Sequence, residues 1–316
     1  MEIKIIKNRS DIGAGTRGSD MGIDALEIAA INSYNDFFNK YIFEDIKTHN
    51  ETIYQKNTNS FAKRIEHVVE QCNRVCVSVE KSISENFFTI VLSGDHSSAL
   101  GTISGIKKAN QDKKLGIVWI DAHADLHSPF TSPSGNIHGM PLAAALNLDN
   151  EEYKINEVET NTIERWEALK NIGIIGPKIN PSNIILMGLR DYEQAEEQVI
   201  AEHNITYFKV EEIRVIGISN CIKKCLNQLN DCDIIYLSFD VDSMDCDQIS
   251  YGTGTPAKSG FLPEEIILIL ENFIETKKVC CLEIAEINPL LDNKGNKMAE
   301  TAFQILESIE HKILQL

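Results

Sequence analysis

The chain has 316 residues, of which 43% are hydrophobic, and this is enough apolar surface for a large folded core rather than a disordered protein. Its formal net charge of −17 argues against binding to nucleic acid or to an anionic membrane surface. No apolar run approaches membrane-spanning length, and the first residues lack the apolar stretch of a secretory signal. None of the eight cysteines forms a CxxC pair, so we expect reduced thiols in the core of a cytoplasmic protein.

Short apolar runs alternate with helical patterns along most of the chain. Seven runs have the composition of buried strands: Glu2–Ile6, Thr89–Leu92, Leu115–Ile120, Asn183–Met187, Ile205–Phe208, Ile234–Phe239 and Val279–Ala285. Helical spacing predicts helices over Phe61–Val79 and from Ala302 to Ile313, and Pro263 marks the start of another. The alternation predicts an α/β fold, with helices on both sides of a mostly parallel sheet. Since no repeat or flexible linker interrupts it, we expect one domain over residues 1–316.

Acidic and imidazole side chains follow three of the predicted strands. They lie in the segments Asp121-Ala-His123-Ala-Asp125, Asp240-Val-Asp242 and Gly94-Asp95-His96. Alternate residues of an extended segment point the same way, and ligands of parallel sheets bind at the carboxyl ends of the strands. Carboxylate and imidazole ligands without thiolate suit manganese or magnesium better than zinc or copper. A lone Asp here would usually be a cap or turn residue, but the three segments together predict a site for two divalent ions.

Two such ions can share a hydroxide that is nucleophilic at neutral pH, because the cations lower its pKa. Asp121 and Asp240 each come first in their acidic segments, and we expect them to bridge both ions. The predicted site would therefore supply a metal-bound nucleophile.

Five segments resemble, in order, the motifs of the arginase-type ureohydrolases. They are Ser93-Gly94-Asp95-His96-Ser97, Asp121-Ala-His123-Ala-Asp125, Gly135-Asn136-Ile137-His138-Gly139, Ser238-Phe239-Asp240-Val241-Asp242 and Glu286-Ile-Asn288-Pro289. An early loop, Gly13-Ala-Gly15-Thr-Arg17-Gly18, also resembles the N-terminal loop of this family. The resemblance implies a three-layer αβα sandwich with two Mn²⁺ ions per subunit. It implies that one ion is held by His96, Asp121, Asp125 and Asp240, and the other by Asp121, His123, Asp240 and Asp242.

The resemblance also implies the roles of three catalytic residues. The bridging hydroxide would attack the guanidinium carbon of the substrate, and Asp125 would carry a proton to the departing amine. Glu286 would bind the guanidinium group, whose parallel N–H donors suit a partly buried carboxylate. His138 would shuttle protons between the site and solvent, since imidazole titrates near neutrality.

The loop from Asp125 to His138 distinguishes among guanidino substrates. It resembles the arginase loop that receives the α-carboxylate of an amino acid, and this implies contacts from His127, Ser132, Ser134 and Asn136. Asp191 and Glu193 lie in a segment that resembles the part of the family that holds the α-ammonium group, and Thr255 is a further candidate for substrate contact. We therefore predict manganese-dependent hydrolysis of L-arginine to L-ornithine and urea.

Three departures from the family pattern leave alternatives open. His127 stands where arginases commonly have Asn, Glu193 is one methylene longer than the usual Asp, and the loop Asp245–Tyr251 lacks the usual Asp-Pro. One alternative is another amidinohydrolase: an agmatinase, a guanidinobutyrase or a formimidoylglutamase. The other is a non-catalytic member of the family. The resemblance also implies a homo-oligomer, either a trimer or a hexamer.

Overall fold

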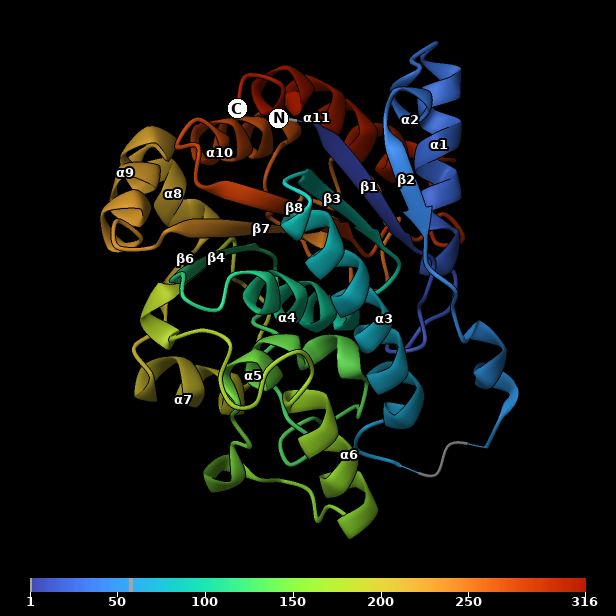
Figure 1. Ribbon diagram of the computed structural model, residues 1–316, viewed down its shortest axis with the longest axis vertical. Helices are drawn as coiled ribbons and strands as arrows, with labels where there is room; N and C mark the ends of the chain where they lie inside the picture. Colours follow the sequence, from blue (N-terminus) through green and yellow to red (C-terminus); the bar gives the residue numbers. More distant parts are fainter. Residues whose placement is uncertain (1, 57–58) are drawn as a thin grey trace.

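The computed structural model describes residues 2–56 and 59–316, and these contain one sheet of eight strands (Figure 1). The strands are β1 Ile3–Asn8, β2 Ile42–Asp45, β3 Phe88–Ser93, β4 Leu115–Ile120, β5 Ile184–Met187, β6 Thr206–Phe208, β7 Ile234–Asp240 and β8 Val279–Ala285. Their order is β2-β1-β3-β8-β7-β4-β5-β6, and every neighbouring pair is parallel. The predicted α/β class and parallel sheet are confirmed. The sequence analysis missed β2, a short and largely exposed edge strand.

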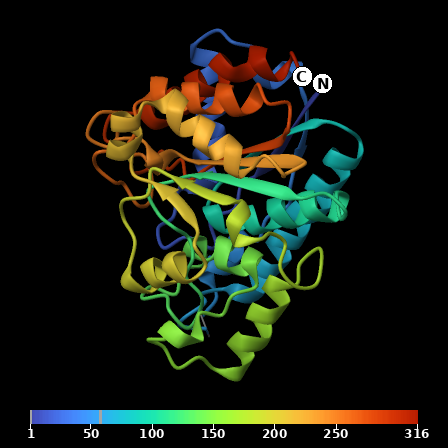
Figure 2. The same cartoon turned by 90° about the vertical axis from the view of Figure 1, so that its left-hand side faces the viewer.

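Helices cover both faces of the sheet, so that the molecule has three layers (Figure 2). The α-helices are α1 Gly22–Asn32, α2 Phe37–Lys40, α3 Ile65–Ser84, α4 Ala99–Ala109, α5 Pro141–Leu146, α6 Thr160–Lys170, α7 Gln194–Glu202, α8 Val210–Ile216, α9 Ile218–Gln228, α10 Pro263–Ile274 and α11 Lys297–Ile313. Helices α1, α9, α10 and α11 pack on one face, against side chains such as Ile5, Leu237 and Leu282. Helices α3, α4, α5 and α7 pack on the other, against Trp119 and Tyr236. No helix in the described part of the chain has the length and apolarity needed to cross a bilayer.

The helix start predicted at Pro263 was right, the one at Phe61 was wrong, and the helix predicted from Ala302 begins earlier, at Lys297. Pro263 occupies the first turn of α10, and α11 contains the predicted apolar stripe up to Ile313. Helix α3 begins at Ile65 rather than at Phe61, because Arg64 has a left-handed backbone (φ 57°) that cannot continue a right-handed helix. The helical spacing of the preceding residues therefore does not reflect a helix.

The four central strands carry the predicted site. Strands β3, β8, β7 and β4 are neighbours in the sheet, and their carboxyl ends lead to His96, Glu286, Asp240 and Asp121, respectively. Asp240 pairs in register with Ala285, and Ile120 with Phe239. The parallel arrangement thus brings side chains separated by up to 190 residues to one edge of the sheet.

Candidate metal centre

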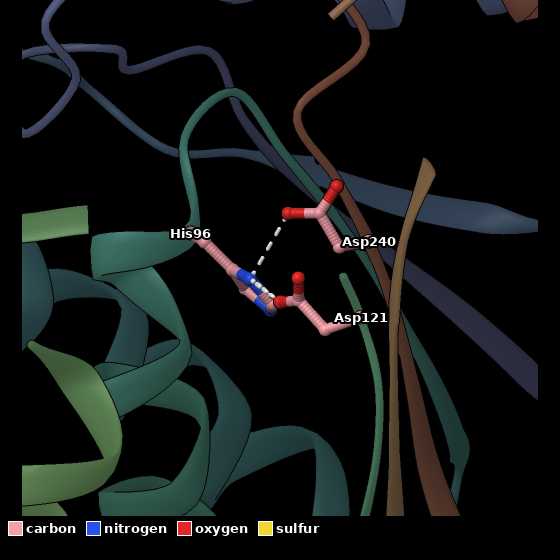
Figure 3. Close-up of side chains that lie close together, drawn as sticks. All are labelled: His96, Asp121 and Asp240. Atoms are coloured by element: carbon pink, nitrogen blue, oxygen red, sulfur yellow. Dashed lines mark ion pairs between the residues drawn. The ribbon is translucent and has the colours of Figure 1, made fainter. Parts of the chain in front are cut away.

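His96 lies at the middle of a first group of buried carboxylates (Figure 3). Its Nδ1 atom is 3.1 Å from Asp121 Oδ2, 3.1 Å from Asp240 Oδ2 and 3.2 Å from Asp125 Oδ2. The imidazole is held by stacking on Trp119, with ring centroids 4.1 Å apart, and by a 2.7 Å hydrogen bond between Nε2 and Ser238 Oγ. The ring is therefore fixed with Nδ1 facing three carboxylates.

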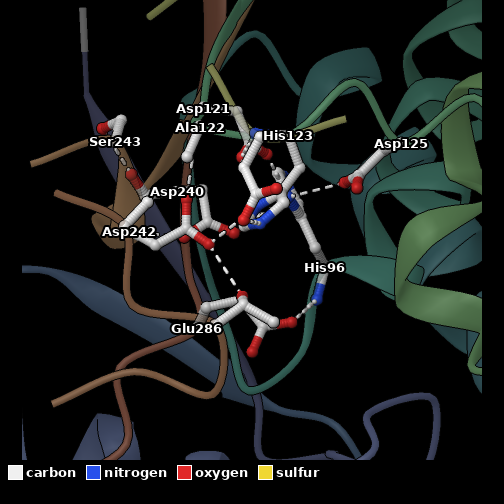
Figure 4. Close-up of polar contacts among 12 residues, drawn as sticks. His96, Asp121, Ala122, His123, Asp125, Asp240, Asp242, Ser243 and Glu286 are labelled. Carbon is white, nitrogen blue, oxygen red and sulfur yellow. Dashed lines mark hydrogen bonds and ion pairs between the residues drawn. The ribbon is translucent and has the colours of Figure 1, made fainter. Parts of the chain in front are cut away.

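A second group forms around His123 and shares Asp121 with the first (Figure 4). His123 Nδ1 is 3.0 Å from Asp242 Oδ2 and 3.4 Å from Asp121 Oδ1. The two oxygens of Asp121 thus face different imidazoles, which is the arrangement of a bridging ligand. Asp240 belongs to the first group, and its predicted bridging role stays a prediction.

Local turns orient the two acidic segments. Asp121 Oδ1 accepts the backbone N–H of His123 at 2.7 Å, and Asp240 Oδ1 accepts that of Asp242 at 2.8 Å. A carboxylate that binds the N–H two residues ahead closes a tight turn. In both segments the turn occupies Oδ1 and leaves Oδ2 directed toward His96.

The residues present fit a pair of divalent cations. Within residues 2–56 and 59–316, His96 Nδ1 and Asp121 Oδ2 are buried polar atoms without a hydrogen bond of acceptable geometry. Buried polar atoms are rarely left unpaired in proteins, and a metal ion would satisfy both. Burial and the charges of Asp242 and Asp121 raise the pKa of Asp240 well above its ordinary value. Burial and the charge of Asp121 raise the pKa of Asp125 to about 6, so the carboxylates repel one another and attract cations.

Two residues of the site have strained backbones. Asp125 and Glu286 have φ values of 52° and 67°, a left-handed region that is unfavourable for residues other than glycine. The Glu286 N–H donates to the carbonyl oxygen of Gly94 at 2.9 Å, which links the ends of β8 and β3. Such strain persists where the surroundings hold the residue firmly, as is common at functional sites.

Glu286 is buried and forms an ion pair with the partly buried His138 beside the first group. Glu286 Oε1 is 3.0 Å from His138 Nδ1 and accepts the backbone N–H of His96 at 2.9 Å. Burial alone would lower the pKa of His138, but the hydrogen bond and charge of Glu286 outweigh it and raise this pKa to about 9. Burial opposes ionisation of Glu286, yet His138 lowers its pKa. Both groups are therefore charged at neutral pH.

The predicted residues surround one cavity of about 290 Å³. Every residue predicted for the site lines this cavity except Asp121, which contacts the imidazoles of His96 and His123. No residue of the unusual loop Asp245–Tyr251 lines it. That departure therefore does not alter the cavity wall directly.

The hydroxyl-rich loop contributes to the cavity in different ways. Ser132 is buried, and its Oγ accepts the N–H of Gly135 at 2.9 Å, so that it shapes the turn. Ser134 is exposed, and its Oγ accepts the N–H of Asn136 at 3.1 Å. Outside this loop, Thr255 Oγ1 donates to Asp242 Oδ2 at 2.9 Å and thereby supports a metal-type ligand. Ser134 is thus the hydroxyl of this loop best placed to meet a ligand.

A third cluster joins His127 to two glutamates. His127 Nε2 is 2.9 Å from Glu193 Oε2 and 3.4 Å from Glu196 Oε2, while Nδ1 is 3.1 Å from Thr131 Oγ1. Burial alone would lower the pKa of His127, but the two glutamates outweigh burial and raise this pKa. The hydrogen bond from His127 in turn lowers the pKa of Glu193 to about 2. Asp191 stands apart, with Oδ2 3.7 Å from His123 Nε2.

The sequence analysis did not include Glu196, whose side chain is buried in the cavity wall. It accepts the N–H groups of Leu126 and Glu193, and burial raises its pKa to about 7. The available signal was the spacing of Glu193 and Glu196, which is that of a helix capping box. This spacing predicts a helix start, but it does not predict the contact between Glu196 and His127.

Comparisons with known proteins agree with these observations. A model of the arginase family matches residues 2–310. An arginase of Bacillus subtilis is 35% identical over 316 residues, covering 99% of this chain and 98% of the relative, and an arginase of Bacillus caldovelox is 31% identical, covering 97% of each. A crystal structure of arginase from Bacillus subtilis superposes with a TM-score of 0.80 at 33% identity, covering 98% of each chain. The family resemblance predicted from the motifs is confirmed, and with it the arginase-like fold.

Proposed function

The chain belongs to the arginase family, and from this premise we propose that it hydrolyses L-arginine to L-ornithine and urea with two Mn²⁺ ions. Membership makes it a hydrolase of the ureohydrolase superfamily, and the substrate and the metal are the proposed part. One observation carries the proposal: Asp121 is shared by two groups of hard ligands beside a cavity that also contains the carboxylate of Glu286. Hard ligands suit Mn²⁺, and a carboxylate suits a guanidinium group.

The metal ligands would divide as the family resemblance implies. One ion would be held by His96, Asp121, Asp125 and Asp240, and the other by Asp121, His123, Asp240 and Asp242. When bound, two divalent cations supply a nucleophile from water at neutral pH and neutralise developing negative charge.

Glu286 would orient the guanidinium group of the substrate. Its Oε1 atom is occupied by His138 and by the N–H of His96, whereas Oε2 accepts no hydrogen bond from the described residues. A planar guanidinium group that donates to Oε2 would lie against the metal ligands with its carbon exposed to attack. The pairing with His138 keeps Glu286 ionised and ready for a cation.

Asp125 and His138 would move the protons. Asp125 lies beside His96 at the cavity surface and can carry a proton from the attacking water to the departing amine. His138 is protonated at neutral pH through its contact with Glu286, and it can return a proton to the site after the amine departs. Together they remove the need for a free proton from solvent during bond cleavage.

The loop would hold the amino-acid end of the substrate. Ser134 and Asn136 would donate to the α-carboxylate, Ser132 would shape the turn that carries them, and His127 would add a charge-assisted contact. Asp191 and Glu193 would receive the α-ammonium group, and Thr255 would keep Asp242 in place at the cavity wall.

One observation favours a second candidate substrate. Glu193 already has a cationic partner, because His127 Nε2 lies 2.9 Å from it. A guanidino acid that lacks the α-ammonium group, such as 4-guanidinobutyrate, would leave that pair intact and still use the hydroxyl-rich loop. A guanidinobutyrase is therefore the alternative to arginase, ahead of an agmatinase or a formimidoylglutamase.

A substrate screen with Mn²⁺ tests the proposal. Urea release would be compared for L-arginine, agmatine and 4-guanidinobutyrate, and ammonia release would be measured with formimidoylglutamate. We expect kcat/KM to be highest for L-arginine. Near-zero turnover of L-arginine by the manganese-loaded protein would refute the proposal, and turnover of no substrate would favour the non-catalytic alternative.

The remaining expectations concern assembly and location. We propose one catalytic domain over residues 1–316, in a cytoplasmic homo-oligomer of three or six subunits, as the family resemblance implies. Sedimentation equilibrium would distinguish these assemblies from a monomer.

A further inference from the structure

Glu283 is a fully buried carboxyl group outside the proposed ligand sets. It lies within β8, and its oxygens accept hydrogen bonds from Ser93 Oγ at 2.6 Å and from Tyr236 Oη at 2.7 Å. Both hydroxyls donate, so Glu283 is an acceptor at both oxygens. In the described part of the chain, no Lys, Arg or His side chain forms an ion pair with it. A fully buried carboxyl group without a cationic partner is uncommon, so its position requires an explanation.

A series of hydroxyl groups connects Glu283 to the first metal-type group. Glu283 pairs in register with Ser238, and Tyr236 lies two residues before Ser238 in β7, so that the three side chains share one face of the sheet. The hydroxyl of Ser238 hydrogen bonds to Tyr236, and Ser238 Oγ lies 2.7 Å from His96 Nε2. All four of these residues are buried.

The hydrogen-bond directions in this series are determined by its carboxylate end. Tyr236 donates to Glu283, and the phenol oxygen of Tyr236 is free to accept from Ser238. The Ser238 hydroxyl donates its hydrogen bond to Tyr236, and Ser238 Oγ accepts the Nε2–H of His96. With the Nε2 proton held by Ser238, the proton that a metal ion would displace is the one on Nδ1, the atom that faces three carboxylates.

We propose that Glu283, acting through Tyr236 and Ser238, is a positioning residue that holds His96 in its metal-binding tautomer. Second-layer groups that accept the free N–H of a ligating histidine commonly orient the ring and strengthen the ligand. Here the accepting carboxylate acts through two hydroxyls. The inference rests on the proposed metal centre.

Manganese binding to the purified full-length protein tests the inference without using turnover. The variants are Tyr236→Phe and Ser238→Ala, which break the series at different points, and the double variant. Ser238→Ala leaves both hydrogen bonds of Glu283 intact, so it avoids exposing the carboxylate if Tyr236→Phe folds poorly. The control is Ser82→Ala, which removes an equally buried hydrogen bond, 2.7 Å long, to Thr89 outside the series.

Calorimetric titration with Mn²⁺ should give two binding steps in the wild-type protein. Each single variant should weaken one step about 10–100-fold and leave the other unchanged. Because both substitutions interrupt one series, the double variant should lose no more affinity than the weaker-binding single variant. The control should bind like the wild type.

Three results would overturn the inference. They are unchanged affinities in both folded single variants, equal weakening of both binding steps, or additive losses in the double variant, since additivity indicates independent structural effects. If the wild-type protein itself bound no Mn²⁺, the proposed metal centre would fail as well. If the wild-type protein binds Mn²⁺ normally and only the variants behave unexpectedly, the hydrogen-bond series fails and the metal centre stands.

Discussion

Asp121→Asn should remove the stabilisation that manganese gives to the protein at both metal-type groups. The two oxygens of Asp121 face different imidazoles, with Oδ2 3.1 Å from His96 Nδ1 and Oδ1 3.4 Å from His123 Nδ1. Asparagine keeps the shape of the side chain but loses the charge and one acceptor oxygen. Asp242→Asn should affect one group only, because Asp242 belongs to the second group alone.

The size of the effect follows from mass action at two sites. A ligand at a hundred times its Kd stabilises the folded state by about 2.7 kcal/mol per site, so two sites give about 5 kcal/mol. For a chain of 316 residues this corresponds to a rise in Tm of about 8 °C. We expect the Mn²⁺-dependent rise to disappear in Asp121→Asn and to fall to about 4 °C in Asp242→Asn.

Scanning calorimetry of the metal-free and manganese-loaded proteins measures this difference. Asp112→Asn, which changes an exposed acid away from the cavity, is the control and should keep the full rise. The same samples should show arginine hydrolysis nearly abolished by Asp121→Asn. A full Mn²⁺-dependent rise in Tm, or more than a tenth of the wild-type rate, in Asp121→Asn would refute the shared-ligand reasoning.

Other experiments test the protonation, the loop and the substrate contact of the same site. Mn²⁺ affinity should increase between about pH 6 and about pH 8, because the neighbouring carboxylates outweigh burial and hold the pKa of both ligating imidazoles well above its ordinary value. Each imidazole must then lose a proton to bind metal, and calorimetry in two buffers should detect proton release; a pH-independent affinity would contradict this. Gly135→Ala should destabilise the protein by about 1–3 kcal/mol in urea unfolding, because φ is +71° and the new Cβ would lie 2.1 Å from the carbonyl oxygen of Ser60. Gly176→Ala, with φ +79° and open space around it, measures the backbone cost alone, and equal losses would rule out the clash. Ser134→Ala should raise KM for L-arginine about fivefold with little change in kcat, as expected for loss of one ground-state hydrogen bond. An unchanged KM in steady-state kinetics would place the carboxylate contact elsewhere.

Local sequence patterns were sufficient to predict most of the fold and the chemical type of the site. Buried strands such as β4 and β7 are apolar at nearly every position, because both faces are covered by helices. The acidic segments after them place alternate side chains on one side of the backbone, a property that depends on extended geometry alone. Edge strand β2 escaped prediction because its exposed residues carry no burial pattern, and only pairing with β1 makes it a strand.

The sequence by itself determined that carboxylates and imidazoles would gather at the carboxyl edge of a parallel sheet, because apolar runs and ligand spacing are local properties. Only the tertiary structure decided which of them meet. The neighbours β3, β8, β7 and β4 come from distant parts of the chain, and their order in the sheet pairs Glu286 with His138 and places Asp121 between two imidazoles. The same order buries Glu283 beside Tyr236. Such contacts depend on packing between remote segments, and no pattern within one segment encodes them.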